Sequence, residues 1–408
     1  MKIRIPTHNA ALWLATALAS ILAAPGALAQ APVGTIKIGL PVPLTGPYGA
    51  EAKDQVRNAE LAIKEFNDAG GLAGRKAELL VRDDKLNPGE AAARALELIE
   101  KDHVNFIVGA LSASTQLAIN NVTRQRKVLY ISISQSDAIN EAADFSRYTF
   151  HEALNPQMTT QAVGRYVFKK GMRIAFLTAD YAYGHEMTRG FTRVAQEVGA
   201  QVVGELKHPL GAADYSTFLP RLQALKPDVI VFNNFGRDNQ ISIRQAGDFG
   251  MKKSMAFVTP VLTYTSRLAA GPQVYEGVVG GSSYFWGIET STPSAKRFNT
   301  SYRAANGTVE PSDYGSVAYS AVKSLLDAVK AAGSAETEKV VDALAALKYD
   351  TYKGAQYYRS CDHQSVQSVL VIGSNSTSGK NPADVFKVLQ IVPGSTGMLR
   401  SCAELGHK

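Results

Sequence analysis

The sequence predicts an α/β fold with two doubly wound, Rossmann-like lobes. Three observations lead to this prediction: a strand–turn–helix–strand unit at residues 36–84, a regular alternation of strand and helix patterns up to residue 258, and the length of the chain. Strands that alternate with helices of ordinary length favour parallel sheets covered by helices. A chain of 408 residues also exceeds the size at which one hydrophobic core stops growing, so two lobes are expected.

The opening unit begins with an apolar, β-branched run at 36–42, which predicts a buried strand. A turn at 45–47 follows, and apolar residues then recur at helical spacing between 56 and 66 until Gly70 and Gly71 end the helix. A second strand is predicted at 78–81. Because such a βαβ unit is right-handed, its first turn lies at the carboxyl end of a parallel sheet, where open α/β sheets bind ligands.

The same alternation continues along the chain. The further strand candidates are 106–108, 128–131, 173–177, 201–205, 229–232 and 256–258. The helical patterns are 88–100, 115–126, 156–169, 186–197, 217–225 and 239–249, followed later by 318–331 and 337–347. Two more strand candidates, 366–372 and 385–392, lie near the C-terminus.

The first 29 residues have the pattern of a secretory signal peptide. Lys2 and Arg4 precede an apolar core at 10–24, and Ala27-Leu28-Ala29 offers a small-x-small cleavage site. The apolar run is shorter than the roughly 20 residues that a membrane span needs, and no cysteine nearby could carry a lipid. We therefore expect cleavage near Ala29 and export to the periplasm.

Composition and motifs argue against several function classes. The formal charge is +7, but basic and acidic residues are interspersed, which gives no support to nucleic-acid binding. No nucleophile elbow, phosphate-binding loop, HExxH or dinucleotide-binding glycine motif occurs, so we expect a protein that is not an enzyme, with no catalytic residues and no cofactor. The seven histidines show no metal-ligand spacing, and no metal site is expected.

The two cysteines, Cys361 and Cys402, both lie near the C-terminus. In an oxidising compartment such a pair most often forms a disulfide. The alternative is a pair of inert free thiols.

Two turns rich in small and hydroxyl residues follow neighbouring strand candidates. The first holds Ser112, Ala113 and Ser114, and the second holds Ser134, Gln135 and Ser136. Hydroxyl residues at such places often only cap helices. Helix N-termini also bind anions, however, so the two turns together could converge on one small anion.

The pattern LTGP, a helix, then N-x-x-GG-[IL]-x-GR and a strand ending in Asp83-Asp84 resembles the leucine/isoleucine/valine-binding family of periplasmic receptors for ABC importers. The resemblance extends from about residue 36 to about residue 393. It implies a type I periplasmic binding protein, expected to be a monomer, that binds a ligand carboxylate between two lobes and docks to an ABC permease. In that family the carboxylate-contacting positions match Ser112 or Ala113, Ser134 and Ser136.

The resemblance also implies that the chain crosses between the lobes near His151, Tyr284 and Lys353. Lobe I is then expected at 33–151 with 285–353, lobe II at 152–284 with 354–395, and a C-terminal tail at 396–408. These crossings form a three-crossover hinge.

Four aromatic residues match positions that line the family's cleft: Tyr48, Tyr183, Phe235 and Tyr314. Without the resemblance, each of them would more often be a core or edge residue. Tyr264 and Trp286 are weaker candidates.

One position departs from the amino-acid-binding members, which hold the ligand's ammonium with an acidic residue. Val261 occupies that position here, and burying an ammonium without a partner costs several kcal/mol. A carboxylate with an aromatic body fits better, and the C-terminal part resembles the subgroup that binds aromatic acids. The alternatives are a branched-chain or other amino-acid-binding protein, or a bilobal ligand sensor for a membrane kinase.

Overall fold

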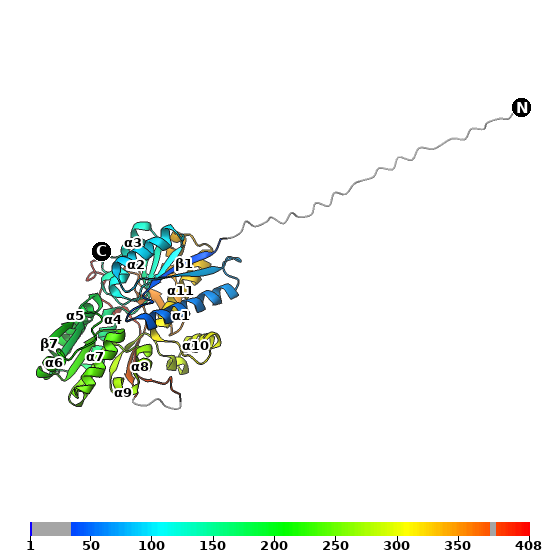
Figure 1. Ribbon diagram of the computed structural model, residues 1–408. Helices are drawn as coiled ribbons and strands as arrows, with labels where there is room; N and C mark the ends of the chain where they lie inside the picture. Colours follow the sequence, from blue (N-terminus) through cyan, green and yellow to red (C-terminus); the bar gives the residue numbers. More distant parts are fainter. Residues whose placement is uncertain (2–33, 376–380) are drawn as a thin grey trace. The chain divides into compact units, whose positions relative to one another are not determined.

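The computed structural model describes Met1, residues 34–375 and residues 381–408 (Figure 1). The chain divides into two compact units, 1–34 and 35–408, and the fold described below is that of the second unit. The expected signal peptide and its cleavage site at Ala29 lie outside the described residues.

The first sheet has five strands that are all parallel, in the order β2-β1-β3-β4-β5. Its elements are β1 (Ile36–Val42), α1 (Gly49–Asp68), β2 (Ala77–Asp83), α2 (Pro88–Glu100), β3 (Phe106–Gly109), α3 (Ala113–Arg126), β4 (Leu129–Ser132) and β5 (Thr149–His151). Helix α2 begins where the Asn87 side chain accepts a hydrogen bond from the Glu90 amide, with Pro88 in the first turn. The strands β3, β4 and β5 are entirely buried, as expected for a parallel sheet covered on both faces.

The second sheet has seven strands in the order β15-β14-β10-β9-β8-β6-β7. Its strands are β6 (Arg173–Ala179), β7 (Gln201–His208), β8 (Val229–Asn233), β9 (Ala256–Val261), β10 (Val279–Ser282), β14 (Val369–Ser374) and β15 (Phe386–Val392). The helices between them are α4 (Pro156–Val167), α5 (Ala182–Val198), α6 (Leu219–Ala224), α7 (Gly236–Asp248), α8 (Tyr264–Ala270) and α9 (Pro272–Tyr275). Strands β14 and β15 are antiparallel to their neighbours, and the other five strands are parallel.

The remaining elements lie outside the two large sheets. They are α10 (Pro293–Asn306), α11 (Asp313–Ala332), α12 (Thr337–Ala346), a small antiparallel sheet of β11 (Lys348–Tyr349), β12 (Gln356–Tyr358) and β13 (Ser365–Val366), and the short 3₁₀ helices η1 (Ala138–Asn140), η2 (Met251–Lys253), η3 (Trp286–Thr290) and η4 (Thr396–Met398). Helix α11 lies beside α1, although more than 240 residues separate them (Figure 1): the Tyr319 hydroxyl donates to Glu65 at 2.7 Å. The Ser312 hydroxyl donates to Asp54 at the start of the same contact.

The predicted fold class is confirmed, and the predicted alternation corresponds to observed strands and helices. The prediction at 366–372 divides into β13 and β14, because the chain leaves one sheet and enters another at this point. Helix α11 begins five residues earlier than predicted, where the Ser312 side chain accepts from the Gly315 amide. Strands β5, β10, β11 and β12 and helices α8, α9 and α10 were not predicted. Strand β5 has only three residues, and β10 contains two glycines that break the apolar pattern.

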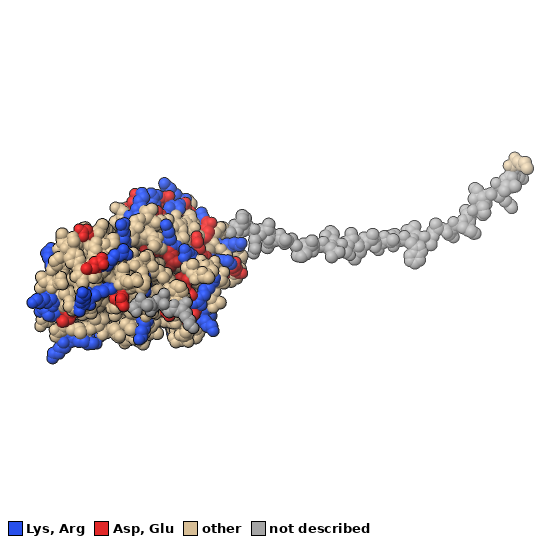
Figure 2. Space-filling view, turned by 60° about the horizontal axis from the view of Figure 1, so that its bottom comes forward, with Lys and Arg blue, Asp and Glu red and all other residues tan. Residues whose placement is uncertain are grey.

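Charged side chains are distributed over the surface. Figure 2 shows one face, on which Lys and Arg side chains lie among Asp and Glu side chains. In the part of the chain that the structure describes, no helix is both long and apolar enough to cross a bilayer.

Three chain segments meet around one buried carboxylate, that of Glu152. It accepts hydrogen bonds from Ser320 (2.6 Å), Gln356 (3.1 Å), Tyr358 (2.8 Å) and Tyr349. Because burial disfavours the charged form, the pKa of Glu152 is raised.

Lys353 lies beside this network. Its Nζ donates to the carbonyls of Ser283 (2.9 Å) and Ser368 (3.0 Å), while the rings of Tyr352 and Tyr284 lie 5.2 Å apart. The positions predicted as chain crossings, near 151, 284 and 353, therefore lie together. Burial lowers the pKa of Lys353 to about 7.

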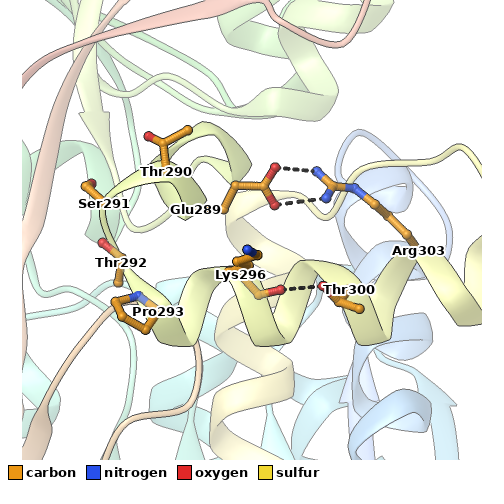
Figure 3. A pocket seen from close by; sticks show the side chains of 8 residues that line it. All are labelled: Glu289, Thr290, Ser291, Thr292, Pro293, Lys296, Thr300 and Arg303. Carbon is orange, nitrogen blue, oxygen red and sulfur yellow. Dashed lines mark hydrogen bonds and ion pairs between the residues drawn. The ribbon is translucent and has the colours of Figure 1, made fainter.

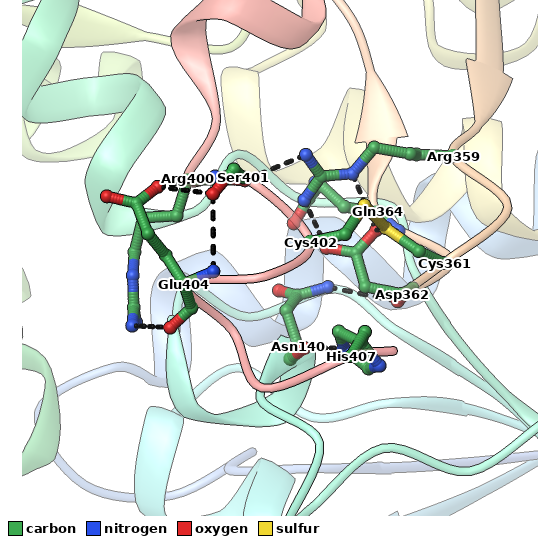
Figure 4. The surroundings of a disulfide bond; sticks show 10 residues. All are labelled: Asn140, Arg359, Cys361, Asp362, Gln364, Arg400, Ser401, Cys402, Glu404 and His407. Atoms are coloured by element: carbon green, nitrogen blue, oxygen red, sulfur yellow. Dashed lines mark hydrogen bonds and ion pairs between the residues drawn. A yellow bond between two sulfur atoms is a disulfide. The ribbon is translucent and has the colours of Figure 1, made fainter.

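The predicted disulfide between Cys361 and Cys402 is confirmed, with a Cα–Cα distance of 6.2 Å (Figure 4). The C-terminal tail also forms an ion pair between Arg400 and Glu141 at 2.6 Å, and the His407 ring bonds the Asn140 carbonyl at 2.7 Å. The bridge thus fixes the tail against the segment that follows β4.

Replacing both cysteines by serine should lower the free energy of unfolding by about 2–4 kcal/mol, because the bridge closes a loop with a sequence separation of 41 residues. Denaturant unfolding of both proteins measures the difference. Mass analysis of the exported wild type without reductant should show no alkylatable thiol, and two labelled cysteines would contradict the bridge.

Lys353 should make stability depend on pH in a specific direction. Its pKa is about 7 in the folded protein and about 10.4 in the unfolded chain, so between these values the unfolded chain binds more protons and stability rises with pH. Relative to Lys353→Met, the wild type should gain about 2 kcal/mol between pH 7 and pH 9. Lys348→Met, at an exposed neighbour, is the control, and a wild-type curve parallel to Lys353→Met would contradict the prediction.

Candidate ligand-binding site

The structure brings the four predicted aromatic residues into one cluster around Phe235. The Phe235 ring lies 4.9 Å from Tyr48, 6.3 Å from Tyr183 and 4.9 Å from Tyr314. Tyr48 follows β1 of the first sheet, whereas Tyr183 and Phe235 follow β6 and β8 of the second sheet. The cluster therefore joins loops at the carboxyl ends of strands from both sheets, together with the first turn of α11.

Tyr181, which the sequence analysis did not select, completes this cluster. Its hydroxyl lies 2.9 Å from that of Tyr48, and its ring stacks on Tyr183 at 5.9 Å. The backbone of Gly236 has φ +56°, and a Cβ there would lie 2.7 Å from Tyr48 Cδ1, so only glycine lets the ring approach.

The Tyr183 hydroxyl is the polar group that the cluster leaves unsatisfied. It is buried, and within the described residues it has no hydrogen-bond partner. Burial raises the pKa of Tyr183, so the phenol keeps its proton and can donate. A buried hydroxyl without a partner carries a free-energy cost that a bound acceptor would remove.

The two hydroxyl-rich turns lie side by side, as predicted. The Ser134 hydroxyl donates to the Leu111 carbonyl at 2.8 Å, and the Ile133 amide donates to the Gly109 carbonyl at 3.1 Å. Ser134 is therefore committed to a contact within the protein.

The first turn leads directly into α3. Ser112 is the N-cap residue but makes no side-chain cap, and Ala113 and Ser114 form the first helical positions. Helix N-termini carry unpaired amides and a partial positive charge. In the second turn, the Gln135 side chain accepts from Thr159 at 3.2 Å.

Ser136 contacts an acid that the sequence analysis missed. Its hydroxyl donates to Glu186 Oε1 at 3.1 Å, and the Asp137 amide donates to Glu186 Oε2 at 3.1 Å. Glu186 lies on α5, one helical turn after Tyr183, so the second turn and the aromatic cluster are linked through one helix.

Val261 is the buried last residue of β9, and two acids contact the residues at 264–266 that follow it in the chain. The Tyr264 amide donates to Asp313 Oδ1 at 3.0 Å, while Asp313 Oδ2 is buried and has no partner within the described residues. Burial raises the pKa of Asp313 to about 7. Glu51 accepts from Thr265 at 2.7 Å and from Ser266 at 3.2 Å.

A cavity of about 540 Å³ lies apart from these residues, between η3 and α10 (Figure 3). Glu289 and Arg303 form an ion pair at its edge, at 2.9 Å. None of the predicted ligand residues lines it, so its size does not make it the candidate site.

The weaker aromatic candidates have structural roles. The indole N–H of Trp286 donates to the Ala383 carbonyl at 3.1 Å, and the Tyr264 ring lies 6.5 Å from Phe386. Among the described residues there is also no group of three His, Cys, Asp or Glu side chains that could hold a metal ion.

The comparisons with known proteins agree with this geometry. A family model of periplasmic binding proteins matches residues 35–380. Leu/Ile/Val-binding protein homolog 1 of Brucella suis is 27% identical over 338 residues, which cover 82% of this chain and 87% of that relative.

Solved structures share the fold. A periplasmic binding protein from Burkholderia mallei has a TM-score of 0.82 at 28% identity and covers 88% of this chain and 95% of its own. A solute binding protein from Rhodopseudomonas palustris BisB5, solved with 3,4-dihydroxybenzoic acid, has a TM-score of 0.78 at 23% identity and covers 88% and 98%. The chain belongs to the periplasmic binding protein family with the type I fold, and membership implies a periplasmic protein that binds a small molecule, works with an ABC permease and is not an enzyme.

Proposed function

We propose that this protein is the solute-binding receptor of an ABC importer and that its ligand is a small carboxylate with an aromatic body. The observation that carries the proposal is the cluster of Tyr48, Tyr183, Phe235 and Tyr314, which unites loops of both sheets. Aromatic side chains prefer edge-to-face and offset contacts with other rings. A ligand ring that inserts among them would replace contacts that the protein makes with itself.

The two sheets form the cores of two lobes in this proposal. Lobe I comprises 33–151 with 285–353, and lobe II comprises 152–284 with 354–395. The crossings near 151, 284 and 353 act as a hinge, and closure around the ligand presents one surface to the permease.

The carboxylate end of the ligand is proposed to lie at the two hydroxyl-rich turns. The amides of Ala113 and Ser114 begin a helix of 14 residues, and Ser112, with its uncommitted side chain, precedes them. Ser134, Gln135 and Ser136 form the opposite wall. Backbone amides and a helix dipole suit a carboxylate because they supply donors and positive charge. In the structure the Ser134 hydroxyl donates to the Leu111 carbonyl and the Ser136 hydroxyl to Glu186.

Solved relatives support the compatibility of this fold with such ligands. One Rhodopseudomonas palustris neighbour was solved with 3,4-dihydroxybenzoic acid and another with benzoate. At sequence identities of 23% and 20%, these structures show that the fold is shared. The proposed ligand class therefore rests on the residues of this chain.

An amino acid is the second candidate, and one observation favours it. Asp313, next to Tyr314 in the chain, has a buried oxygen with no partner among the described residues, and this oxygen could face an ammonium. The raised pKa of Asp313 weakens this alternative, because a carboxyl that holds its proton attracts a cation poorly.

Calorimetry with benzoate, 4-hydroxybenzoate, 4-coumarate and leucine on one preparation separates the two candidates. An aromatic acid should bind with a dissociation constant in the micromolar range or tighter, about −8 kcal/mol or more favourable, whereas leucine should bind weakly. Tight leucine binding without heat from the aromatic acids would overturn the proposed ligand class and favour Asp313 as an ammonium partner.

Phe235→Ala should weaken the binding of aromatic acids by about 1.5–3 kcal/mol, because it removes the ring at the centre of the cluster. Phe249→Ala is the matched control, since Phe249 is exposed and lies just after α7, the helix that follows Phe235. Titration calorimetry of both variants tests this. Equal affinity in the two variants would place the ligand ring elsewhere.

A further inference from the structure

Glu186 is held in the structure by the kind of donors that recognise a carboxylate. One oxygen accepts from the Ser136 hydroxyl and the other from the Asp137 amide, both at 3.1 Å. Glu186 belongs to α5 beside the second sheet, whereas Ser136 and Asp137 follow β4 of the first sheet. The side chain is 4% exposed, so this contact between the two sheets is buried.

We propose that Glu186 is an internal competitor for the ligand: its carboxyl group occupies the Ser136 and Asp137 donors, and a small carboxylate has to displace it in order to bind there. The inference rests on the proposed function, because it takes Ser136 as part of the ligand site. It makes Glu186 a residue that sets the affinity for carboxylates without belonging to the binding surface.

The competition follows from the number of hydrogen-bond donor hydrogens at this place. A serine hydroxyl and a backbone amide each carry one hydrogen, and both hydrogens point to Glu186. The Ser136 oxygen also accepts from the Ala138 amide at 3.2 Å, which fixes its position. A ligand carboxylate cannot use these two donors while Glu186 holds them.

The charges around Glu186 couple its displacement to the release of a proton. Asp137, whose Oδ1 accepts from the Gln157 amide at 3.1 Å, lies next to Glu186, and two buried carboxylates side by side cannot both ionise at ordinary cost. Arg189 forms a long ion pair with Glu186 Oε1 at 3.9 Å, but its side chain is largely exposed, so water weakens the attraction. The other charged or titratable groups that act on the pair are Arg193 on α5, Arg400 of the C-terminal tail and Tyr181.

Burial, followed by the charge of Asp137, raises the pKa of Glu186 above its ordinary value of about 4.3. When a ligand displaces Glu186 into water, that pKa falls back and the group releases its proton. The liganded protein then holds fewer protons than the free protein. Carboxylate affinity should therefore rise with pH between the ordinary and the raised pKa.

The first test is Glu186→Ala, titrated by calorimetry with benzoate, 4-hydroxybenzoate and 4-coumarate at pH 7. The tightest of these probes should bind about tenfold more tightly than to the wild type, because the competing hydrogen bonds are gone. Glu197→Ala, an exposed acid on the same helix, is the matched control and should leave affinity unchanged. Thermal unfolding of each variant verifies that it is folded.

A double-mutant cycle tests whether the effect acts through Ser136. On a Ser136→Ala background, Glu186→Ala should increase the affinity for the probe by less, because one of the two donors for which Glu186 and the ligand compete is absent. An undiminished gain would overturn competition at Ser136.

The pH dependence provides a readout that does not rely on truncation. From pH 5.5 to 7.5 the wild type should bind the probe progressively more tightly, by at most tenfold per pH unit, since one proton is released. Glu186→Gln keeps the shape of the side chain but has no proton to release, so its affinity should be nearly independent of pH.

The outcomes separate this inference from the proposed function. If aromatic acids bind the wild type but Glu186→Ala weakens them, Glu186 is a ligand contact and the competitor role is overturned while the receptor function stands. Affinity that falls with rising pH leads to the same conclusion. If no probe carboxylate binds the wild type or any variant, the proposed ligand class fails and the inference fails with it.

Discussion

The carboxyl group of Glu152 accepts hydrogen bonds from four side chains on three separate elements: α11, β11 and β12. A buried acid is costly unless its oxygens are satisfied, and here every acceptor position has a donor. The arrangement brings the segment after β5 together with α11 and the small sheet, and Lys353 beside it reaches the carbonyl of Ser283. A network of this kind favours one arrangement of these segments over others.

The aromatic cluster and the acids beside it form a second set of contacts between the two sheets. Each ring pair contributes about 0.5–1.5 kcal/mol beyond the burial of its area, and the pairs join segments that follow strands of both sheets. Glu51, Asp313 and Glu186 each add hydrogen bonds between segments of the two sheets. At the proposed site a ligand would have to exceed these internal contacts in free energy, so its affinity would report the difference between two well-packed arrangements.

The elements that could be read from the sequence were those with a local signature. Hydrophobic periodicity indicated the strands and helices of both sheets, and glycine and hydroxyl residues marked the turns at their carboxyl ends. Glu186 and Asp313 could not be identified, because an acid in the first or second turn of a helix has the same local pattern whether water or another segment faces it. Their partners lie about 50 residues away in sequence, so only the tertiary arrangement gives these acids a role.

Trp286 packs against Phe285 at 5.2 Å and donates its indole N–H to the segment before β15. The chain contains two tryptophans, and the other, Trp13, belongs to the expected signal peptide. In the exported protein the tryptophan emission would then come from one indole, in η3. The molecule thus carries a built-in optical label, and spectral changes could be assigned to one place without engineering a dye into the chain.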